Sequence, residues 1–368
     1  MNSRERLLHC LYGEPVDRVP VSTYELVGYN REAWENKEPS YHRLMEAIRA
    51  QTDCLYMDGP DWLLPQQPWQ ETKTWREGCS TFQRSCLHTA DGPLEQLSRQ
   101  DDKVHTTWTI KHFLTELTDI DRYLSLPYEP PRISFTRFDA TARELGGHGL
   151  MMISVSDPIC EAAHLFSMAD FLVLARTETC KIRYFLDALF DRQQANLRQM
   201  LSHDVKDVVF RICGPEYATP PYLPPDLFRL LVTRYLIPIC RQIRQAGAIP
   251  RIHCHGKIGQ VLDQFAETEA LALDPLEPPP DGDIELAAIK RRYGDRFCLQ
   301  GNIELRELEN GTPGRIDQLV RQAMAAAKGQ GRFILMPTAA PINIPLSPRT
   351  EANYLQMIES GLRYGSYV

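Results

Sequence analysis

The chain has 368 residues, of which 43% are hydrophobic, so it can bury a large core as one α/β domain or as two smaller ones. A net charge of −7 without blocks of like charge disfavours nucleic-acid binding, and no apolar run reaches membrane-spanning length. The charged N-terminus is unlike a signal peptide, and ten cysteines without a CxxC pair are typical of a reducing compartment, so we expect a cytoplasmic protein.

The first part of the chain predicts two strands, residues 19–24 and 53–57, separated by a helix over residues 41–50. The pattern then changes between residues 62 and 149. Segments such as Ser80-Thr81-Phe82-Gln83-Arg84 alternate in the way antiparallel strands do, and Asp91-Gly92-Pro93 marks a turn between two of them. We interpret residues 62–149 as a β-rich excursion, with two helices of its own, that folds over the mouth of the main body.

From residue 150 the chain alternates between apolar strands and amphipathic helices. The predicted strands cover residues 150–155, 208–213, 249–254, 271–276, 297–300 and 333–336. With the two earlier strands the count is eight, most of them followed by a helix, which favours a TIM (β/α)8 barrel formed as a single domain by residues 1–368. A doubly wound sheet is the alternative, but no glycine-rich phosphate loop follows the first strand.

The segment His253-Cys254-His255 lies at the end of one apolar strand. Because side chains alternate along a strand, the two histidines share a face and Cys254 points away from them. Glu277, at the end of the next strand, is the best candidate for a further ligand. Imidazole and carboxylate ligands suit zinc, iron or manganese, so we predict a metal site formed by His253, His255 and Glu277. Two histidines lining a polar pocket without a metal are the alternative.

Polar residues follow most of the other predicted strands as well. They are Tyr24, Glu25, Asp58, Asp61, Asp157, Glu216, Tyr217, Asp283, Asn302 and Glu304. In a TIM barrel these strand ends meet at the face that carries the active site, and so many carboxylates beside two histidines indicate a metal site or a site for a cationic substrate.

Several of these residues also have purely structural interpretations. Asp157 precedes Pro158 and can cap a helix, Asp283 can belong to a turn, and Asn302 can stabilise its own loop. Glu216 and Glu277 each follow an apolar strand closely and are flanked by prolines, which favours a function in the site.

Several motifs resemble those of the uroporphyrinogen decarboxylase superfamily, in particular its methyltransferase-like branch. They are Ser3-Arg4-Glu5-Arg6, Asp17-Arg18-Val19-Pro20-Val21, the hairpin His88-Thr89-Ala90-Asp91-Gly92-Pro93-Leu94, Lys111-His112-Phe113 and Gly301-Asn302. The resemblance extends along nearly the whole chain and implies a TIM barrel.

The resemblance also implies a function. In the methyltransferase branch a zinc ion held by His-x-Cys, a later Cys and in some enzymes a Glu activates a thiol that exchanges a methyl group with a corrinoid protein. Here His253 stands at the family histidine, His255 at the cysteine and Glu277 at the glutamate. The later cysteine is absent, because Ala339 lies near its place.

We therefore expect metal-assisted methyl transfer between a small molecule or thiol and a corrinoid partner, catalysed by a homodimer. The expected catalytic residues are Glu216, Asp157 and Asp58, and the expected substrate-binding residues are Tyr217, Asn302, Asp283 and Tyr24. The metal would be zinc or another divalent ion.

Two other functions are kept as alternatives. One is cofactor-free decarboxylation of a small acid, with Asp58 or Asp61 as the electrostatic group. Uroporphyrinogen itself is disfavoured as the substrate, because residues 20–30 lack the arginines of the decarboxylase branch. The other alternative is a barrel that binds a small molecule without catalysis.

Overall fold

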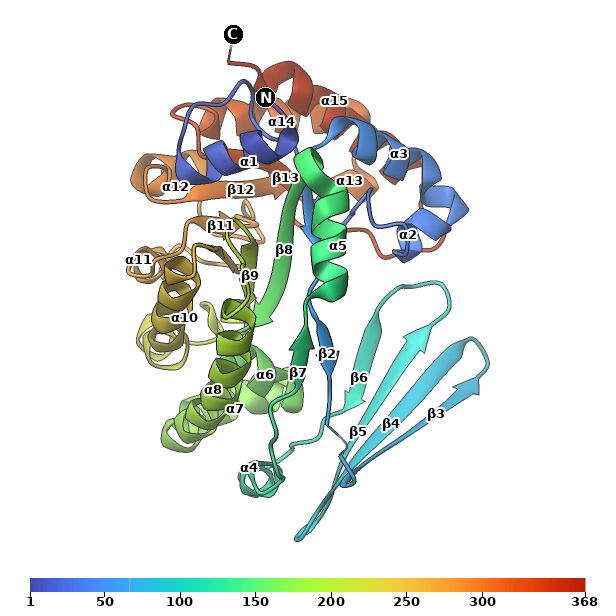
Figure 1. The fold of residues 1–368 in the computed structure, drawn as a ribbon, viewed down its shortest axis with the longest axis vertical. Coiled ribbons are helices and arrows are strands. Elements are labelled where there is room, and N and C mark those ends of the chain that lie inside the picture. The colour runs from blue at the N-terminus through green and yellow to red at the C-terminus, as the bar shows by residue number, and fades with distance from the viewer. Residues whose placement is uncertain (66, 368) are drawn as a thin grey trace.

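A curled sheet of seven parallel strands forms the centre of the computed structural model, which describes residues 1–65 and 67–367 (Figure 1). The strand order is β1-β8-β9-β10-β11-β12-β13. The strands are β1 (Cys54–Met57), β8 (Gly149–Ser156), β9 (Val209–Cys213), β10 (Ile249–His253), β11 (Ala272–Asp274), β12 (Cys298–Ile303) and β13 (Phe333–Pro337). All seven lie within or close to segments that the sequence predicts as strands.

The prediction of a strand over residues 19–24 is wrong. The segment forms only a single bridge, between Val21 and Leu335 of β13. Its backbone does reach both edges of the sheet, because the Ser22 amide donates to the Leu335 carbonyl (2.9 Å) and the Asp53 amide donates to the Val21 carbonyl (2.7 Å). Pro20 has no amide hydrogen, and the Val21 amide donates to the Asp53 carboxylate instead of a ladder carbonyl. The described residues therefore form a curled seven-stranded sheet, where the sequence predicts eight strands in a closed barrel.

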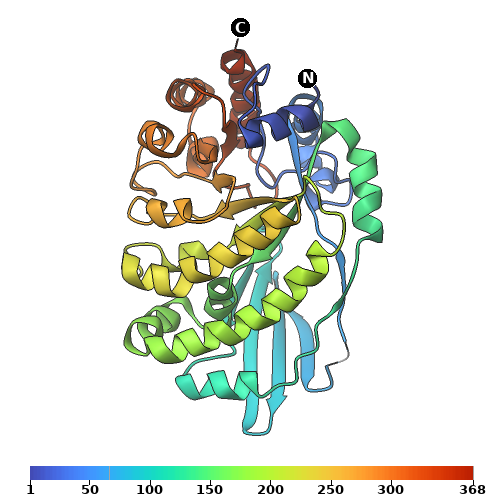
Figure 2. The same ribbon diagram turned by 60° about the vertical axis from the view of Figure 1, so that its left-hand side comes forward.

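Helices cover the outer face of this sheet (Figure 2). In chain order the helices of the main body are α1 (Ser3–Tyr12), α2 (Trp34–Lys37), α3 (His42–Gln51), α6 (Pro158–Leu165), α7 (Met168–Thr177), α8 (Thr179–Leu201), α9 (Pro225–Phe228), α10 (Arg234–Gln245), α11 (Leu262–Ala266), α12 (Leu286–Tyr293), α13 (Leu305–Asn310), α14 (Pro313–Ala327) and α15 (Pro348–Gly365). Helix α14 illustrates why these segments form helices that pack on the sheet. Thr312 caps its N-terminus, and one buried stripe is formed by Ile316, Val320, Ala323 and Met324.

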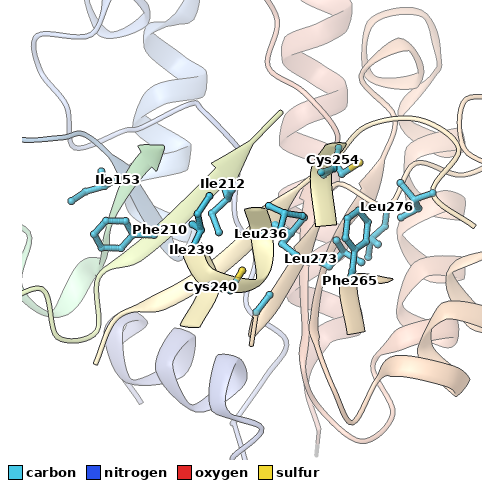
Figure 3. Close-up of a cluster of buried hydrophobic side chains, with 14 of the residues drawn as sticks. Ile153, Phe210, Ile212, Leu236, Ile239, Cys240, Cys254, Phe265, Leu273 and Leu276 are labelled. Carbon is cyan, nitrogen blue, oxygen red and sulfur yellow. The ribbon is translucent and has the colours of Figure 1, made fainter. Parts of the chain in front are cut away.

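Two hydrophobic clusters lie on opposite faces of the sheet. The larger cluster packs the outer face against the helices, as Ile153, Phe210 and Ile212 do against Leu236 and Ile239 of α10 (Figure 3). The smaller cluster fills the inner face, where Leu7, Cys10 and Leu11 of α1 contact inward residues such as Val209 and Ile249. Neighbours such as Val209 and Phe210 belong to different clusters because side chains alternate along a strand.

The predicted β-rich excursion is present, although its residue 66 lies outside the described residues. It contains a four-stranded antiparallel sheet and a separate strand pair. These strands are β2 (Asp61–Leu63), β3 (Gln70–Glu77), β4 (Ser80–Thr89), β5 (Gly92–Asp101), β6 (Thr107–Lys111) and β7 (Arg132–Ser134). Helix α4 (Leu117–Leu124) lies between β6 and β7, and helix α5 (Thr136–Leu145) follows β7.

The four-stranded sheet lies on the side of the molecule to which the arrowhead of β8 points (Figure 1). It contacts the main body at the loop after β13, where the His105 amide donates to the Ile342 carbonyl (2.8 Å) and Val104 bridges to Asn343. Over the described ranges, no single helix is long and apolar enough to cross a membrane, and α6 with α7 meets that test only as a pair bent by 118°.

Candidate active site

The candidate site is organised around the end of β10. Ile249 belongs to the inner cluster and Ile252 to the outer one, so Arg251 and His253 point to the inner face with Ile249. Cys254 packs in the outer cluster, away from the two histidines, as predicted. The rings of His253 and His255 lie 4.7 Å apart between centroids, at an interplanar angle of 86°.

His253 is held from both sides by buried groups. Its Nδ1 lies 2.7 Å from an Asp274 carboxylate oxygen, and its Nε2 lies 3.2 Å from the Tyr24 hydroxyl. Arg211 donates to the same hydroxyl at 2.6 Å, which leaves the Tyr24 proton for His253 Nε2. Burial lowers the pKa of His253 to about 4, even though Asp274 opposes this shift. His253 is therefore neutral at pH 7, with its proton on Nδ1.

Asp274 links His253 to a buried guanidinium. Arg251 donates to Asp274 through Nε at 2.5 Å, and both side chains are almost completely buried. Burial alone would raise the pKa of Asp274, but Arg251 and His253 outweigh it and hold that pKa far below the usual range of a carboxyl group. The carboxylate is thus a fixed negative charge beside the His253 imidazole.

His255 has a carboxylate partner of its own. Its Nδ1 lies 2.7 Å from Glu277 Oε1, and the Gly256 amide donates to Glu277 Oε2 at 2.6 Å. The His255 side chain is 33% exposed, whereas that of His253 is 3% exposed. Burial lowers the pKa of His255, but the hydrogen bond and the charge of Glu277 outweigh burial and raise it overall. His255 is therefore the imidazole that can carry a proton and reach a substrate.

The three predicted metal ligands lie close together, but they do not fit a three-ligand site in this arrangement. Both oxygens of Glu277 are already hydrogen-bonded, and His253 Nε2 faces the Tyr24 hydroxyl. Within residues 1–65 and 67–367, no group of three or more His, Cys, Asp and Glu side chains is placed to hold a metal ion. Glu277 stands behind His255, as a carboxylate does when it orients an imidazole through Nδ1. We assign no step of the chemistry to a metal.

Asp157 and Glu216 form an acidic side of the site. Asp157 caps α6, because its Oδ1 accepts the Cys160 amide (2.9 Å), so the capping interpretation is confirmed. Its Oδ2 is buried without a hydrogen-bond partner in the described chain. Burial raises the pKa of Asp157 well above the usual value, and the nearby Glu216 raises it further. Burial also raises the pKa of Glu216, which accepts the Gly214 amide at 3.1 Å. Both groups are thereby held towards the protonated form.

The other predicted residues are placed less centrally. Tyr217 bonds to His164 Nε2 through its hydroxyl (2.9 Å), and Asn302 is half-buried on β12. Asp283 accepts the Gly259 amide at 2.8 Å in an exposed turn. Asp58 is ion-paired with Arg137 of α5, which also pairs with Asp61. The structure thus brings Tyr24, among the four predicted substrate-binding residues, into hydrogen-bond contact with the histidine pair.

Sequence reasoning missed Arg211 and Asp274 as members of the site. Each is the only charged residue in an otherwise apolar predicted strand, residues 208–213 and 271–276. A single charged residue in a strand with two buried faces could have identified both residues, because charged groups are rarely buried unless they are paired. Glu304 was recognised only as part of the strand ends; burial and the nearby Glu277 raise its pKa to about 7.

Comparisons with known proteins agree with this architecture. The family model described as uroporphyrinogen decarboxylase (URO-D) matches residues 109–347. A methyltransferase from Methanosarcina mazei has a similar solved structure, with a TM-score of 0.62 and 15% sequence identity over 99% of each chain. At that identity the likeness concerns the fold alone. No curated protein matches the sequence.

Proposed function

Since the chain belongs to the uroporphyrinogen decarboxylase family, we propose that it is an enzyme that moves a methyl group between a small molecule or thiol and a corrinoid partner. The observation that carries this proposal is the pair of imidazoles on one strand end, each oriented through Nδ1 by its own carboxylate. This arrangement directs both Nε2 atoms away from their carboxylates and presets the position of His255 Nε2 for proton transfer.

In this proposal His255 takes the proton of the attacking thiol or hydroxyl group. Its Nε2 has no hydrogen-bond partner in the described chain, and Glu277 stabilises the imidazolium that forms. His253 remains neutral and, with its hydrogen-bond partner Tyr24, lies next to the place of the attacking group beside His255. The corrinoid, carried by a partner protein, would donate or accept the methyl group.

A second candidate is cofactor-free decarboxylation of a small acid. It is favoured by Asp157 and Glu216, whose raised pKa values keep protons available to replace the departing carbon dioxide. Asp58, which the sequence predicts as the electrostatic group, is a weaker candidate because Arg137 already neutralises it.

Three further predictions from the sequence accompany this proposal: closure of the curled sheet into a complete TIM barrel, a homodimer, and a cytoplasmic location. The backbone bonds of residues 20–22 to β13 and to Asp53 support the first of them.

The proposed reaction can be tested with methylcobalamin in place of the corrinoid partner and small thiols such as 2-mercaptoethanol as acceptors. Loss of the methylcobalamin absorbance and appearance of the thioether would report methyl transfer. Replacing His255→Gln should slow the transfer about 100-fold to 10,000-fold, the usual contribution of a general base. His9→Gln, on the half-exposed face of α1, is the matched control.

Two results would contradict the proposal. The first is a His255→Gln variant that keeps the wild-type rate. The second is carbon dioxide release from a small acid, without any methyl transfer, by the wild-type enzyme; it would select the second candidate.

A further inference from the structure

Among the described charged groups of the candidate site, the guanidinium of Arg211 has no buried carboxylate as an ion-pair partner. Arg251 is paired with Asp274 at 2.5 Å, and His255 is paired with Glu277 at 2.7 Å. Arg211 on β9 forms its one ion pair, among described residues, with Glu25 at 3.5 Å. The Glu25 side chain is 43% exposed, so solvent weakens this pair.

Arg211 itself is buried and points to the inner face. Its residue exposure is 8%, and it shares the inward face of β9 with Val209. It donates to the Tyr24 hydroxyl at 2.6 Å, and its guanidinium lies 5.2 Å from the centre of the Tyr24 ring. Its Nε is buried without a hydrogen-bond partner in the described part of the chain.

A buried cation is costly unless an anion or several hydrogen bonds compensate it. Glu216, three residues beyond the end of β9, does not fill this place, because its carboxyl group accepts the Gly214 amide and burial raises its pKa towards the neutral form. The Tyr24 hydroxyl joins Arg211 to His253, so a group bound at Arg211 lies one side chain away from His253. Arg211 therefore has the position and the unused charge to hold one end of a substrate.

We propose that Arg211 binds a carboxylate group of the small-molecule substrate of this site. This proposal depends on the proposed function in one respect, because a bound acid is a substrate only if the site is catalytic. A carboxylate fits better than a phosphate, because Asp274, Glu277 and Glu25 would repel a dianion, whereas a monoanionic planar group matches the guanidinium fork. The substrate would thus be a small acid whose reactive group lies beside His255.

The test compares acids with their matched amides. Benzoate with benzamide, and propionate with propionamide, would be titrated into the purified full chain by calorimetry. We expect the wild type to bind at least one acid more tightly than its amide, and Arg211→Gln to weaken that acid at least tenfold while leaving the amide unchanged. Arg229→Gln is the control, because Arg229 is an exposed arginine paired with Glu267.

Glu25→Gln gives an independent test at an exposed position. Removing this competing carboxylate should strengthen the binding of the acid by up to about fivefold, the effect of losing an exposed ion pair. Arg211→Lys, which keeps the positive charge, should retain part of the preference for the acid if Arg211→Gln does not fold.

Equal binding of acid and amide by the wild type would overturn the inference, as would an unchanged preference in Arg211→Gln. Tighter binding of inorganic phosphate than of every acid, lost in the same variant, would overturn the assignment to a carboxylate. Failure of the proposed reaction can be distinguished from failure of this inference, because methyl transfer is measured in a separate assay. If methyl transfer fails, the wild type should still prefer acids to amides, and Arg211→Gln should still lose that preference.

Discussion

The pKa values of His253 and His255 shift in opposite directions although the two residues lie two positions apart and each faces a carboxylate. His253 is 3% exposed and its pKa falls to about 4, whereas His255 is 33% exposed and its pKa is raised. Removal from water disfavours the charged form, and at His253 this cost exceeds the attraction of Asp274. Only His255 is therefore suited to accept and release a proton near neutral pH.

Replacing Glu277→Gln should lower the pKa of His255, because the carboxylate that stabilises the imidazolium is removed. A raised pKa in the folded state contributes stability that is fully present below the unfolded value, about 6.5, and is lost as the pH rises through the folded value. The stability lost in the variant should therefore be larger at pH 5.5 than at pH 9. NMR titration of His255 and denaturation at both pH values would measure these effects.

Glu267→Gln, which removes an exposed carboxylate paired with Arg229, should leave the pKa of His255 unchanged. An unchanged pKa of His255 in Glu277→Gln would contradict the orienting role of Glu277. A bound divalent metal that is present in the wild type and lost in this variant, measured by elemental analysis, would instead show that Glu277 is a ligand, as the sequence predicts.

Asp274→Asn should destabilise the fold by about 3–5 kcal/mol, because it leaves the guanidinium of Arg251 buried without its counter-ion. The double variant Arg251→Met with Asp274→Leu removes both charges and should cost less than Asp274→Asn alone. Urea denaturation of the three proteins gives the comparison. A cost below about 1 kcal/mol for Asp274→Asn, as expected for an exposed pair, would refute the buried ion pair as a source of stability.

At the scale of elements, the turn after β9 and the start of α6 form one unit. Gly214 has φ 130°, and its position brings the chain against Asp157, the capping residue of α6. A Cβ atom on Gly214 would lie 1.9 Å from Asp157 Oδ1. This close approach places Glu216 and Asp157 on the same side of the site, and only glycine permits it.

Gly214→Ala should therefore destabilise the protein by about 2–4 kcal/mol, from backbone strain together with the displaced cap of α6. Gly59→Ala is a suitable control, because a Cβ atom on Gly59 would meet no other group within 4 Å, and its change should stay within about 0.5 kcal/mol. Thermal and urea denaturation would measure both. Equal stability of the two variants would contradict the proposed packing of this turn.

The strands after residue 150 were predicted well, because each is a mostly apolar run and most are followed by an amphipathic helix. Residues 208–213 illustrate this, since β9 covers Val209–Cys213. The segment 19–24 is also largely apolar but forms no strand. It forms no strand because Pro20 has no amide hydrogen and because the Val21 amide donates to the Asp53 carboxylate instead of to a carbonyl of a neighbouring strand. A local sequence pattern does not show that Asp53 will lie beside Val21.

At the scale of the whole molecule, α1 closes the inner face of the sheet at the end opposite the site. Leu7 and Leu11 of α1 are fully buried against inward side chains of several strands. The N-terminal helix thus completes the smaller hydrophobic cluster, and the polar site lies beyond it on the same inner face. Such a cluster couples the N-terminus to the stability of the entire sheet.

Leu11→Ala should cost about 2–5 kcal/mol, because it removes buried methyl groups and leaves a cavity that rigid strands cannot fill. Leu64→Ala, at a side chain that is 70% exposed, should change the stability by less than about 0.5 kcal/mol. Unfolding followed by both circular dichroism and tryptophan fluorescence would test whether the loss is global. A Leu11→Ala protein as stable as the control would show that α1 is dispensable.

By itself the sequence determined the α/β class, the β-rich excursion, the family resemblance and the proximity of His253 to His255. These properties depend on local periodicity and on motifs whose residues lie near one another in the chain. The tertiary structure alone decided the partners: Asp274 behind His253, Glu277 behind His255, and Arg137 on Asp58, which is 79 residues away in the chain. Hydrogen bonds and ion pairs form between groups that folding brings together, so the role of a carboxylate depends on neighbours that no local pattern records.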